Sequence, residues 1–263
     1  MARHHLLFDL PMVATAAALG ATVGIAPALA LGAVGIGVHT WAVFNPRSRF
    51  YMPLTWAIGP GAPGIAVTFD DGPDEGITPR VLDLLAQQHQ RATFFVIGSH
   101  VRRHPELVRR MVAEGHAIGL HSDHHSRWFN CWSTAAVMGD LQACGMAISD
   151  AAGIPAPRLF RPPVGLKNPL VAAAVARLDL RTVTWSARGF DTTGAPAATV
   201  LRRLTRGLQL GGIVLLHDGC EPGRAGNREV CLAVLPELFA FCAARGWRSF
   251  PLCVAGPGVA LAP

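Results

Sequence analysis

The sequence predicts an α/β fold, a distorted (β/α) barrel with about seven parallel strands, behind an apolar N-terminal segment that meets a membrane. Beyond residue 64, short apolar runs alternate with longer amphipathic runs, as strands and helices do in parallel sheets. Before it, residues 10–45 contain no Asp, Glu, Lys or Arg. The length of 263 residues suits one barrel domain, which needs roughly 200–250 residues.

The N-terminal apolar segment is too long for one simple span. As a single helix, it would extend about 54 Å at about 1.5 Å per residue, against a hydrocarbon core of about 30 Å. A break near Pro27 gives two arms, 10–26 and 28–44, each about 25 Å long. We therefore expect a membrane hairpin. A single tilted anchor and a signal peptide cleaved after Ala28-Leu29-Ala30 are the alternatives.

Arginines flank this segment, with Arg3 before it and Arg47 and Arg49 after it. Because Lys and Arg stay on the cytoplasmic side, a hairpin with both ends inside satisfies this pattern. The pattern predicts a protein of the bacterial inner membrane whose folded domain faces the cytoplasm, with the periplasm as the alternative. The expected organisation is an anchor of one or two helices at 1–45, a linker rich in Pro and Gly at 46–64, and one folded domain at 65–263.

The composition excludes disorder and gives no support to a nucleic-acid partner. Hydrophobic residues make up 51% and charged residues 15% of the chain. The net charge of +6 comes almost entirely from arginines, since Lys167 is the sole lysine, and no Lys/Arg-rich run or RNA-binding aromatic motif accompanies it. Anionic membrane lipids or a phosphate-bearing substrate would suit this charge equally well. The 6 cysteines form no C-x-x-C pair, which favours buried free thiols.

The periodic part of the chain divides into seven strands separated by helices. Asn168 before Pro169 is a helix start signal, and Gly115 and Gly246 stand where helices end. This alternation implies parallel pairing through crossovers, in a barrel short of the usual eight units, with an open doubly wound sheet as the second choice. The predicted strands are 65–69, 92–97, 117–121, 158–160, 181–185, 212–217 and 247–251, and the predicted helices are 78–88, 105–114, 133–152, 169–178, 198–208 and 229–244.

Unusual polar residues follow the predicted strands at their C-terminal ends. In parallel α/β barrels those ends share one face, where catalytic groups from distant parts of the chain converge. Alone, each residue has a plainer explanation, such as a turn for Asp70-Asp71-Gly72-Pro73 or a solvated loop around His121 and His125. Their joint placement favours a site. The residues are Asp70, Asp71, His121, Arg161, Asp191, His217 and Asp218.

These residue types suit a catalytic metal. Two imidazoles and one carboxylate, with open positions for water and substrate, are a recognised arrangement for zinc or a similar divalent ion. Neighbouring residues of an extended segment point in opposite directions, so one of Asp70 and Asp71 can be a ligand while the other acts as a base.

Four separate motifs identify the resemblance. From about residue 65 to 251 the chain resembles the polysaccharide deacetylase family, carbohydrate esterases related to chitin-oligosaccharide deacetylases. The matching motifs, in the family's order, are Thr68-Phe69-Asp70-Asp71-Gly72-Pro73, His121-Ser122-x-x-His125, Arg161-Pro162-Pro163-Val164-Gly165 and Ile213-Val214-Leu215-Leu216-His217-Asp218.

The resemblance implies a role for each site residue. Asp71, His121 and His125 would hold the metal, most simply zinc, while Asp70 would be the base and His217 the acid. Arg161 would orient Asp70, Asp191 would tune His217, and the substrate would contact Pro163, Gly165, Trp185 and Leu215.

Two departures from the family's pattern bear on the substrate. Trp185 comes before Asp191 in the fourth motif, and Val164 replaces the aromatic residue that is common in the third. The positions of Trp185, Arg188 and Asp191 therefore do not match the family's fourth motif one to one, and position 164 offers no aromatic ring for sugar stacking.

The main functional hypothesis is metal-dependent hydrolysis of the N-acyl amide, expected to be N-acetyl, of an amino sugar in a polysaccharide or a lipid-linked saccharide. The apolar segment motivates an alternative, a deformylase or another C–N hydrolase acting on a polyprenyl-linked aminosugar. A third hypothesis, from another class, is an inactive membrane-anchored carbohydrate-binding protein, because fold resemblance alone does not establish activity. The intact set of polar residues argues against the third.

Overall fold

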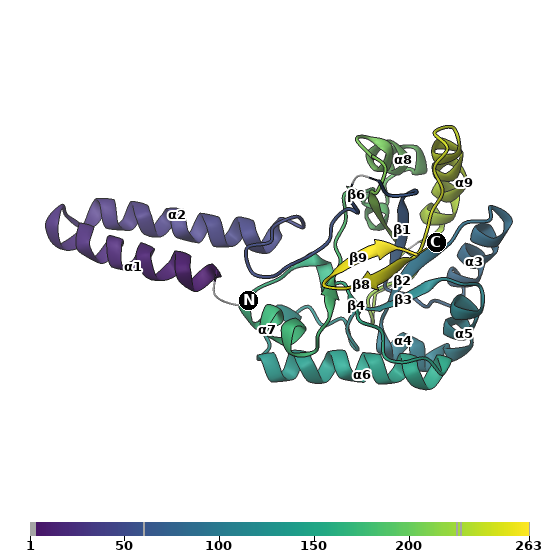
Figure 1. Ribbon diagram of the computed structural model, residues 1–263, viewed down its shortest axis with the longest axis horizontal. Coiled ribbons are helices and arrows are strands. Elements are labelled where there is room, and N and C mark those ends of the chain that lie inside the picture. The colour runs from purple at the N-terminus through teal and green to yellow at the C-terminus, as the bar shows by residue number, and fades with distance from the viewer. Residues whose placement is uncertain (1–3, 60, 225, 227, 263) are drawn as a thin grey trace.

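A computed structural model describes residues 4–59, 61–224, 226 and 228–262, and it shows a helical hairpin extending from an α/β body (Figure 1). The hairpin comprises α1 (His4–Thr22) and α2 (Ile25–Phe44), which pack side by side. The chain turns at Gly24, whose φ of 114° is open to glycine, and not at Pro27 as the sequence predicted. Pro27 lies in the first turn of α2, where backbone N–H groups have no partner within the helix, so a proline costs no helical hydrogen bond.

Among the described helices, α2 alone is long and apolar enough to cross a membrane, over its 20 residues. Such a helix near an N-terminus occurs both in membrane anchors and in signal sequences. The first helix carries Asp9, whose Oδ1 lies 2.7 Å from Nε2 of His39, and Nδ1 of the same histidine lies 2.6 Å from the hydroxyl of Tyr51. These contacts join both arms of the hairpin to the linker. Arg3, on which the predicted orientation partly depends, lies outside the described residues.

The body contains a sheet of 7 strands in the order β5-β4-β3-β2-β1-β7-β6, in which every pair is parallel. Figure 1 shows helices α3 to α9 around the outside of this sheet. The strands are β1 (Ala66–Asp70), β2 (Ala92–Val96), β3 (Ala117–Leu120), β4 (Leu159–Phe160), β5 (Arg181–Thr182), β6 (Ala187–Arg188) and β7 (Ile213–His217).

The connection between the two edge strands shows that the sheet is strongly curled. Only residues 183–186 separate β5 from β6, although these strands are the opposite edges of the sheet. Five Cα steps reach at most about 18 Å, whereas seven flat strands would span about 29 Å. Residues of the linker fill the opening, since Thr55 pairs with Val183 and Ala57 with Gly212. The predicted distorted barrel of parallel strands is confirmed.

The helices match the prediction closely. Ser133 and Asn168 cap two of them by accepting hydrogen bonds from Ala136 N–H and Val171 N–H, which explains where those helices begin. The short helix α4 (Gly98–Arg103) was not predicted. The others are α3 (Thr78–Gln87), α5 (Pro105–Ala113), α6 (Thr134–Ala152), α7 (Pro169–Arg177), α8 (Ala197–Thr205) and α9 (Glu229–Ala243).

The predicted strand at 247–251 is wrong. Within the described residues, that segment makes only an isolated bridge to Ile65, whose N–H donates to the carbonyl of Arg248 and whose carbonyl accepts from Phe250 N–H, both at 2.9 Å. Ser249, in the middle of the bridge, donates its N–H to Gln90 Oε1 at 2.7 Å, and its Oγ accepts from Val67 N–H at 3.0 Å. The chain instead forms an antiparallel pair, β8 (Leu252–Ala255) with β9 (Gly258–Leu261). The seventh strand of the sheet is β6, whose two residues are too short a run to read from the sequence.

Alternation along the strands places the apolar core outside the sheet and the polar site inside it. On β1, Val67 and Phe69 belong to the large core beneath the helices, and the Phe69 ring stacks on Phe94 with centroids 5.1 Å apart. Ala66 belongs to a second, smaller cluster together with Phe95, Leu159, Ile213 and Leu252. Thr68 and Asp70 lie on the same face of β1 as Ala66, opposite to Val67 and Phe69. The two-residue alternation of the strand therefore buries apolar side chains under the helices and directs these polar side chains into the barrel.

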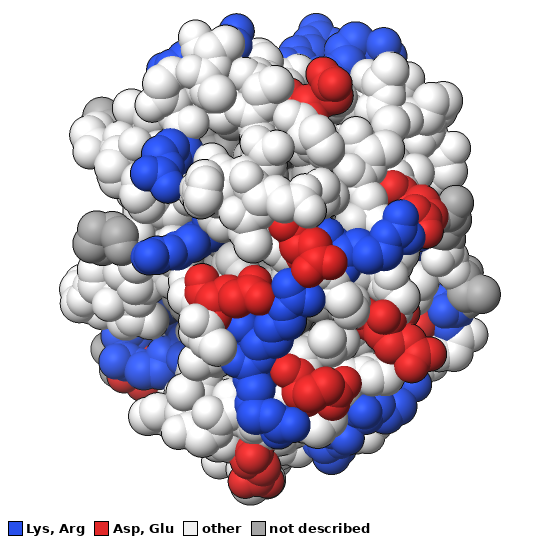
Figure 2. All heavy atoms as spheres, turned by 90° about the vertical axis from the view of Figure 1, so that its right-hand side faces the viewer, with Lys and Arg blue, Asp and Glu red and all other residues white. Residues whose placement is uncertain are grey.

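The outer helices carry charges of both signs. Figure 2 shows Lys and Arg interleaved with Asp and Glu on the face that lies to the right in Figure 1. Arg80 pairs with Glu229, and Arg110 pairs with both Asp83 and Glu114. On this face the positive groups therefore do not form a continuous basic surface.

Candidate active site

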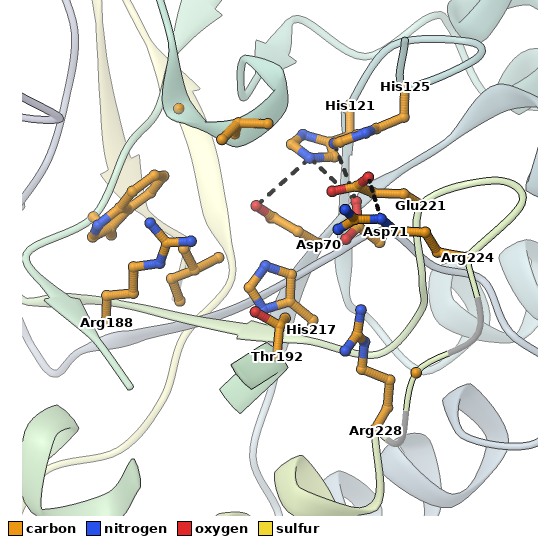
Figure 3. Close-up of a pocket in the computed structure, with 15 residues that line it drawn as sticks. Asp70, Asp71, His121, His125, Arg188, Thr192, His217, Glu221, Arg224 and Arg228 are labelled. Carbon is orange, nitrogen blue, oxygen red and sulfur yellow. Dashed lines mark ion pairs between the residues drawn. The ribbon is translucent and has the colours of Figure 1, made fainter. Parts of the chain in front are cut away.

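The predicted site residues gather at the C-terminal edge of the sheet. Asp70 ends β1 and His217 ends β7, and the two residues are directly opposite each other in the parallel register. Asp71 follows with a φ of 71°, a left-handed conformation that breaks the alternation of the strand. Figure 3 shows the side chains of Asp70, Asp71, His121, His125 and His217 around one cavity.

Asp71, His121 and His125 form a cluster of three ligand atoms that all lie within 4.8 Å of one another. Asp71 Oδ1 is 3.5 Å from His121 Nε2 and 3.4 Å from His125 Nε2. This carboxylate oxygen is buried and accepts no hydrogen bond among the described residues. An orphaned buried oxygen facing two imidazoles is costly without a cation, so the donor set fits a divalent metal.

The tautomer of His121 agrees with metal binding. Its Nδ1 lies 2.8 Å from the carbonyl oxygen of Arg161. A carbonyl only accepts, so Nδ1 carries the proton in the neutral ring and the lone pair of Nε2 faces Asp71. A hydrogen bond of this kind orients a histidine ligand and keeps the correct nitrogen free.

The loop from His121 to His125 folds back on itself to bring the two rings together. Ser122 and His125 adopt positive φ values of 73° and 47°, and Ser122 Oγ accepts a 2.8 Å hydrogen bond from His125 N–H. The ring centroids of the two histidines are 5.0 Å apart. Between them, Asp123 receives a two-point hydrogen bond from Arg102, at 2.8 and 2.7 Å. The guanidinium group of Arg102 thus stabilises the strained conformation of this loop through the carboxylate of Asp123.

Asp70 is held by a fully buried arginine. Arg161 Nη1 donates to Asp70 Oδ1 at 2.6 Å and to Thr68 Oγ1 at 2.8 Å. Burial by itself would raise the pKa of Asp70, but the charge of Arg161, with smaller contributions from His121 and His217, outweighs it and lowers that pKa below its usual value. Asp70 is therefore anionic at neutral pH, as a base must be before it accepts a proton.

The surroundings of His217 shift its pKa in the opposite direction, upward. Its Nδ1 lies 2.9 Å from Asp191 Oδ1, and its backbone N–H donates to Asp191 Oδ2 at 2.8 Å. Burial by itself would lower the pKa of His217, but Asp191 outweighs it and raises the pKa above its usual value. The structure thus places Asp191 against His217.

The sequence profile of the polysaccharide deacetylase family matches residues 58–183. The chain is 36% identical over 198 residues to a chitooligosaccharide deacetylase of Bradyrhizobium, covering 73% of this chain and 90% of that protein. The chain belongs to the polysaccharide deacetylase family.

Other relatives agree with this family membership. A peptidoglycan-N-acetylglucosamine deacetylase of Bacillus cereus is 36% identical over 187 residues, covering 70% of this chain and 86% of its own. Among solved structures, a family 4 carbohydrate esterase of Streptomyces lividans in complex with acetate superposes with a TM-score of 0.67 at 30% identity, over 77% of this chain and 100% of its own. A peptidoglycan N-acetylglucosamine deacetylase gives a TM-score of 0.67 at 28% identity, over 74% and 89%. The predicted family is confirmed, and so is the predicted enzyme class, a hydrolase of carbon–nitrogen bonds other than peptide bonds.

Of the predicted substrate-binding residues of this deacetylase, some line the cavity and one does not. Gly165, Trp185 and Leu215 line the cavity together with Val164. Gly165 is needed for a close approach, because a Cβ there would lie 2.3 Å from the Trp185 ring. Pro163 is buried in the adjoining turn and is absent from the described lining, so its contact with the substrate stays a prediction.

Sequence reasoning missed a second group of lining residues. Glu221, Arg224 and Arg228 come from the loop after β7, and Thr192 from the segment after β6. Arg188 of β6, already named with the fourth motif, lines the same cavity. The signal that could have found them is their position after the C-terminal end of a strand, where barrel loops reach the active face. Asp218 was singled out without a role. It accepts a 2.6 Å hydrogen bond from Thr78 Oγ1 behind the site, and burial raises its pKa to about 7.

Replacing Arg161 tests whether its ion pair with Asp70 supports the fold. We expect Arg161→Met to lower the free energy of unfolding by about 3–5 kcal/mol at neutral pH, because it leaves a buried carboxylate unpaired. Since the folded pKa of Asp70 is lowered, the wild-type contribution is present above about pH 4 and is lost as pH falls through the folded pKa. Urea unfolding at pH 7 and at pH 3 measures this difference.

A matched control is Arg158→Met, which removes an exposed arginine that pairs with Asp179. Because water screens an exposed pair, this variant should unfold almost as the wild type does. Equal stability of the two variants at neutral pH would contradict the assigned importance of the buried pair.

Proposed function

We propose that the protein is a metal-dependent deacetylase that hydrolyses the N-acetyl amide of an amino sugar in a polysaccharide or a lipid-linked saccharide. One observation carries the proposal: a metal-fitting cluster lies beside Asp70, a carboxylate whose pKa is lowered, and Asp70 lies opposite His217, a histidine whose pKa is raised. Two titratable groups whose environments push them in opposite directions are the usual basis of paired base and acid roles.

The metal would be held by Asp71 through Oδ1 and by His121 and His125 through Nε2. We propose zinc, because two imidazoles and one carboxylate are a known zinc-binding set that leaves a position open. When bound, the ion supplies a Lewis acid that polarises an amide carbonyl and lowers the pKa of a water molecule.

Asp70 takes the proton from the attacking water. Its Oδ1 is occupied by Arg161, while its Oδ2 lies 3.8 Å from His121 Nε2 and so faces the ligand cluster. The arginine therefore fixes which oxygen is free, and it keeps that oxygen anionic. Arg161 acts through Asp70 and is a positioning residue, because it is fully buried and does not line the described cavity.

His217 protonates the departing nitrogen. Asp191 accepts from Nδ1, so the imidazolium presents its Nε2–H to the cavity that His217 lines. Without that proton, the amine would have to leave as an anion, which is prohibitive. Asp191 stabilises the charged ring, and it also anchors the backbone at the end of β7.

The substrate class follows from the relatives and from the cavity. The relatives named above are deacetylases of chitooligosaccharides and of N-acetylglucosamine in peptidoglycan. In this chain Leu215 and Trp185 offer an apolar wall for an acetyl methyl group. The helix α2 supports attachment to the bacterial inner membrane, where an anchored enzyme meets lipid-linked saccharides readily. The side of the membrane that we expect is the cytoplasmic one.

Removing the base or the acid should abolish deacetylation while the metal stays bound. We expect Asp70→Asn and His217→Ala each to lower kcat for acetate release from N-acetylated oligosaccharides by about 10²–10⁴-fold, because each removes a proton-transfer group. Acetate is measured enzymatically and metal by elemental analysis. The exposed Asp83→Asn is the control and should match the wild type. Undiminished turnover in either active-site variant would remove that residue from the mechanism.

Adjacent histidines give a sharp test of the metal ligands. We expect His125→Ala to lower metal affinity by at least about tenfold. Loss of a hydrogen bond that supports a metal ligand already lowers the affinity by about that much, and loss of the ligand itself should lower it at least as far. His124→Ala should retain the metal, because the His124 side chain is 67% exposed and contacts only Asp123 and Asp140 among the described residues. Chelation should abolish activity, and zinc should restore it. Equal zinc content of the two variants would refute this ligand set.

The pH profile tests the pairing of His217 with Asp191. Activity needs ionised Asp70 and protonated His217, so kcat/KM should fall at acidic pH below the lowered pKa of Asp70 and at alkaline pH above the raised pKa of His217. Removing the charge that raises the second pKa, by Asp191→Asn, should move the alkaline limb down by roughly 1–3 pH units. Asp179→Asn, at an exposed site, should leave both limbs in place. An unmoved alkaline limb in Asp191→Asn would assign it to another group.

A further inference from the structure

The wall of the active-site cavity carries more positive charge than the proposed chemistry uses. Its lining includes the carboxylates Asp70, Asp71 and Glu221 and the guanidinium groups of Arg188, Arg224 and Arg228. Arg161 already neutralises Asp70, and Asp71 is assigned to the metal. Among the described residues, Glu221 has only Arg224 as an ion-pair partner, at 3.5 Å, which leaves Arg188 and Arg228 without an acidic partner.

Arg188 is the least satisfied of these groups. It is half-buried, its Nε is buried without a hydrogen-bond partner, and no ion pair reaches it within the described part of the chain. Its guanidinium carbon lies 5.3 Å from the centre of the Trp185 ring and 4.7 Å from that of Phe190. Aromatic faces offset part of the cost of removing this charge from water, but they provide no hydrogen-bond acceptor. An anion brought by a ligand would provide one.

Within the described part of the chain, the hydrogen bond of Arg228 uses its Nε and leaves its terminal nitrogens without a partner. Its Nε donates to the carbonyl oxygen of Gly219 at 2.6 Å, which holds the plane of the group. Figure 3 shows this guanidinium directed into the space beside His217, with Arg224 above it and Arg188 across the cavity. Arginines converging from separate elements form a site for an oxyanion, because their planar forks match phosphate and carboxylate oxygens.

We propose that these arginines select an N-acetylated amino sugar that carries an oxyanion, a phosphate or a carboxylate, on the same or the adjoining unit. The inference rests on the function proposed above and deepens it by naming the charge of the substrate. A metal ion would add positive charge to the same cavity, so a charged saccharide is attracted more strongly than a neutral one. The arginines would also orient the amide toward Asp70 and His217 by binding a part of the substrate that does not react.

The test compares charged and neutral substrates in the full-length, zinc-loaded protein. Acetate release is measured from N-acetylglucosamine 1-phosphate, from N-acetylmuramic acid and from neutral di-N-acetylchitobiose. We expect the wild type to favour at least one of the anionic sugars by about tenfold or more in kcat/KM, the size that charge-assisted hydrogen bonds confer. Preference for the first sugar identifies phosphate as the recognised group, and preference for the second identifies carboxylate.

Variants of the cavity arginines test which residues cause the preference for anionic sugars. Arg188→Gln and Arg228→Gln, singly and together, should reduce the ratio of charged to neutral kcat/KM by about tenfold or more, and high salt should have the same effect. Arg188→Lys keeps the charge without the fork and should restore part of the ratio, which separates recognition from loss of folding. Arg206→Gln is the matched control, because Arg206 is exposed and lies outside the described lining.

A second readout does not depend on turnover. Binding of N-acetylglucosamine 1-phosphate to the metal-free protein, measured by calorimetry, should weaken in the double variant and stay unchanged in Arg206→Gln. A wild type without preference for either anionic sugar, or a preference that survives the double variant, overturns the inference while leaving the deacetylase intact. Failure to release acetate from any sugar would instead count against the proposed function, and the binding measurement alone would then decide the oxyanion site.

Discussion

The buried ion pair between Arg161 and Asp70 is the interaction on which the active site depends. It joins residues 91 positions apart in the sequence, at the ends of β4 and β1. Two charges removed from water are stable only when their other hydrogen-bonding groups are also satisfied. Arg161 achieves this through Thr68 Oγ1 and the carbonyl of Thr184, and its guanidinium carbon lies 4.1 Å from the centre of the Phe95 ring. The curl of the sheet is what brings these partners within reach.

The two neighbouring aspartates show how the environment assigns different roles to one residue type. Asp70 follows the alternation of β1 into the barrel and meets a guanidinium, so it is held as an anion with one oxygen free. Asp71 leaves the alternation through its positive φ, and its Oδ1 turns toward two imidazoles without a hydrogen-bond donor of its own. The first is suited to accept a proton and the second to bind a cation, although only one peptide bond separates them.

Charge distribution connects the cavity with the rest of the chain. The outer helices mix both signs in local pairs, whereas the cavity has arginines that lack acidic partners among the described residues. A chain with a net charge of +6 therefore places part of its excess positive charge in the wall of this cavity. As the membrane anchor proposed above, the apolar helix α2 would add a second means of bringing the enzyme to its substrate, because it would hold the enzyme at a lipid surface.

The sequence by itself determined the element types, the family and the identity of the five central polar residues, because strand and helix periodicity and short motifs are local properties. Asp70, Asp71, His121, His125 and His217 could be named since each follows an apolar run or stands in a motif of its own. The position of the hairpin turn was read wrongly, because proline was expected to break a helix that instead begins just before it.

Only the tertiary structure decided the features that depend on how the sheet curls and how distant segments pack together. The two-residue strand β6 exists because β7 pairs with it, and residues 247–251 form no strand of the sheet because their pairing is limited to an isolated bridge with Ile65 among the described residues. The same holds for Arg188 and Arg228, which packing brings to the cavity wall. Such placements depend on contacts between residues far apart in the chain, and local sequence patterns carry no record of them.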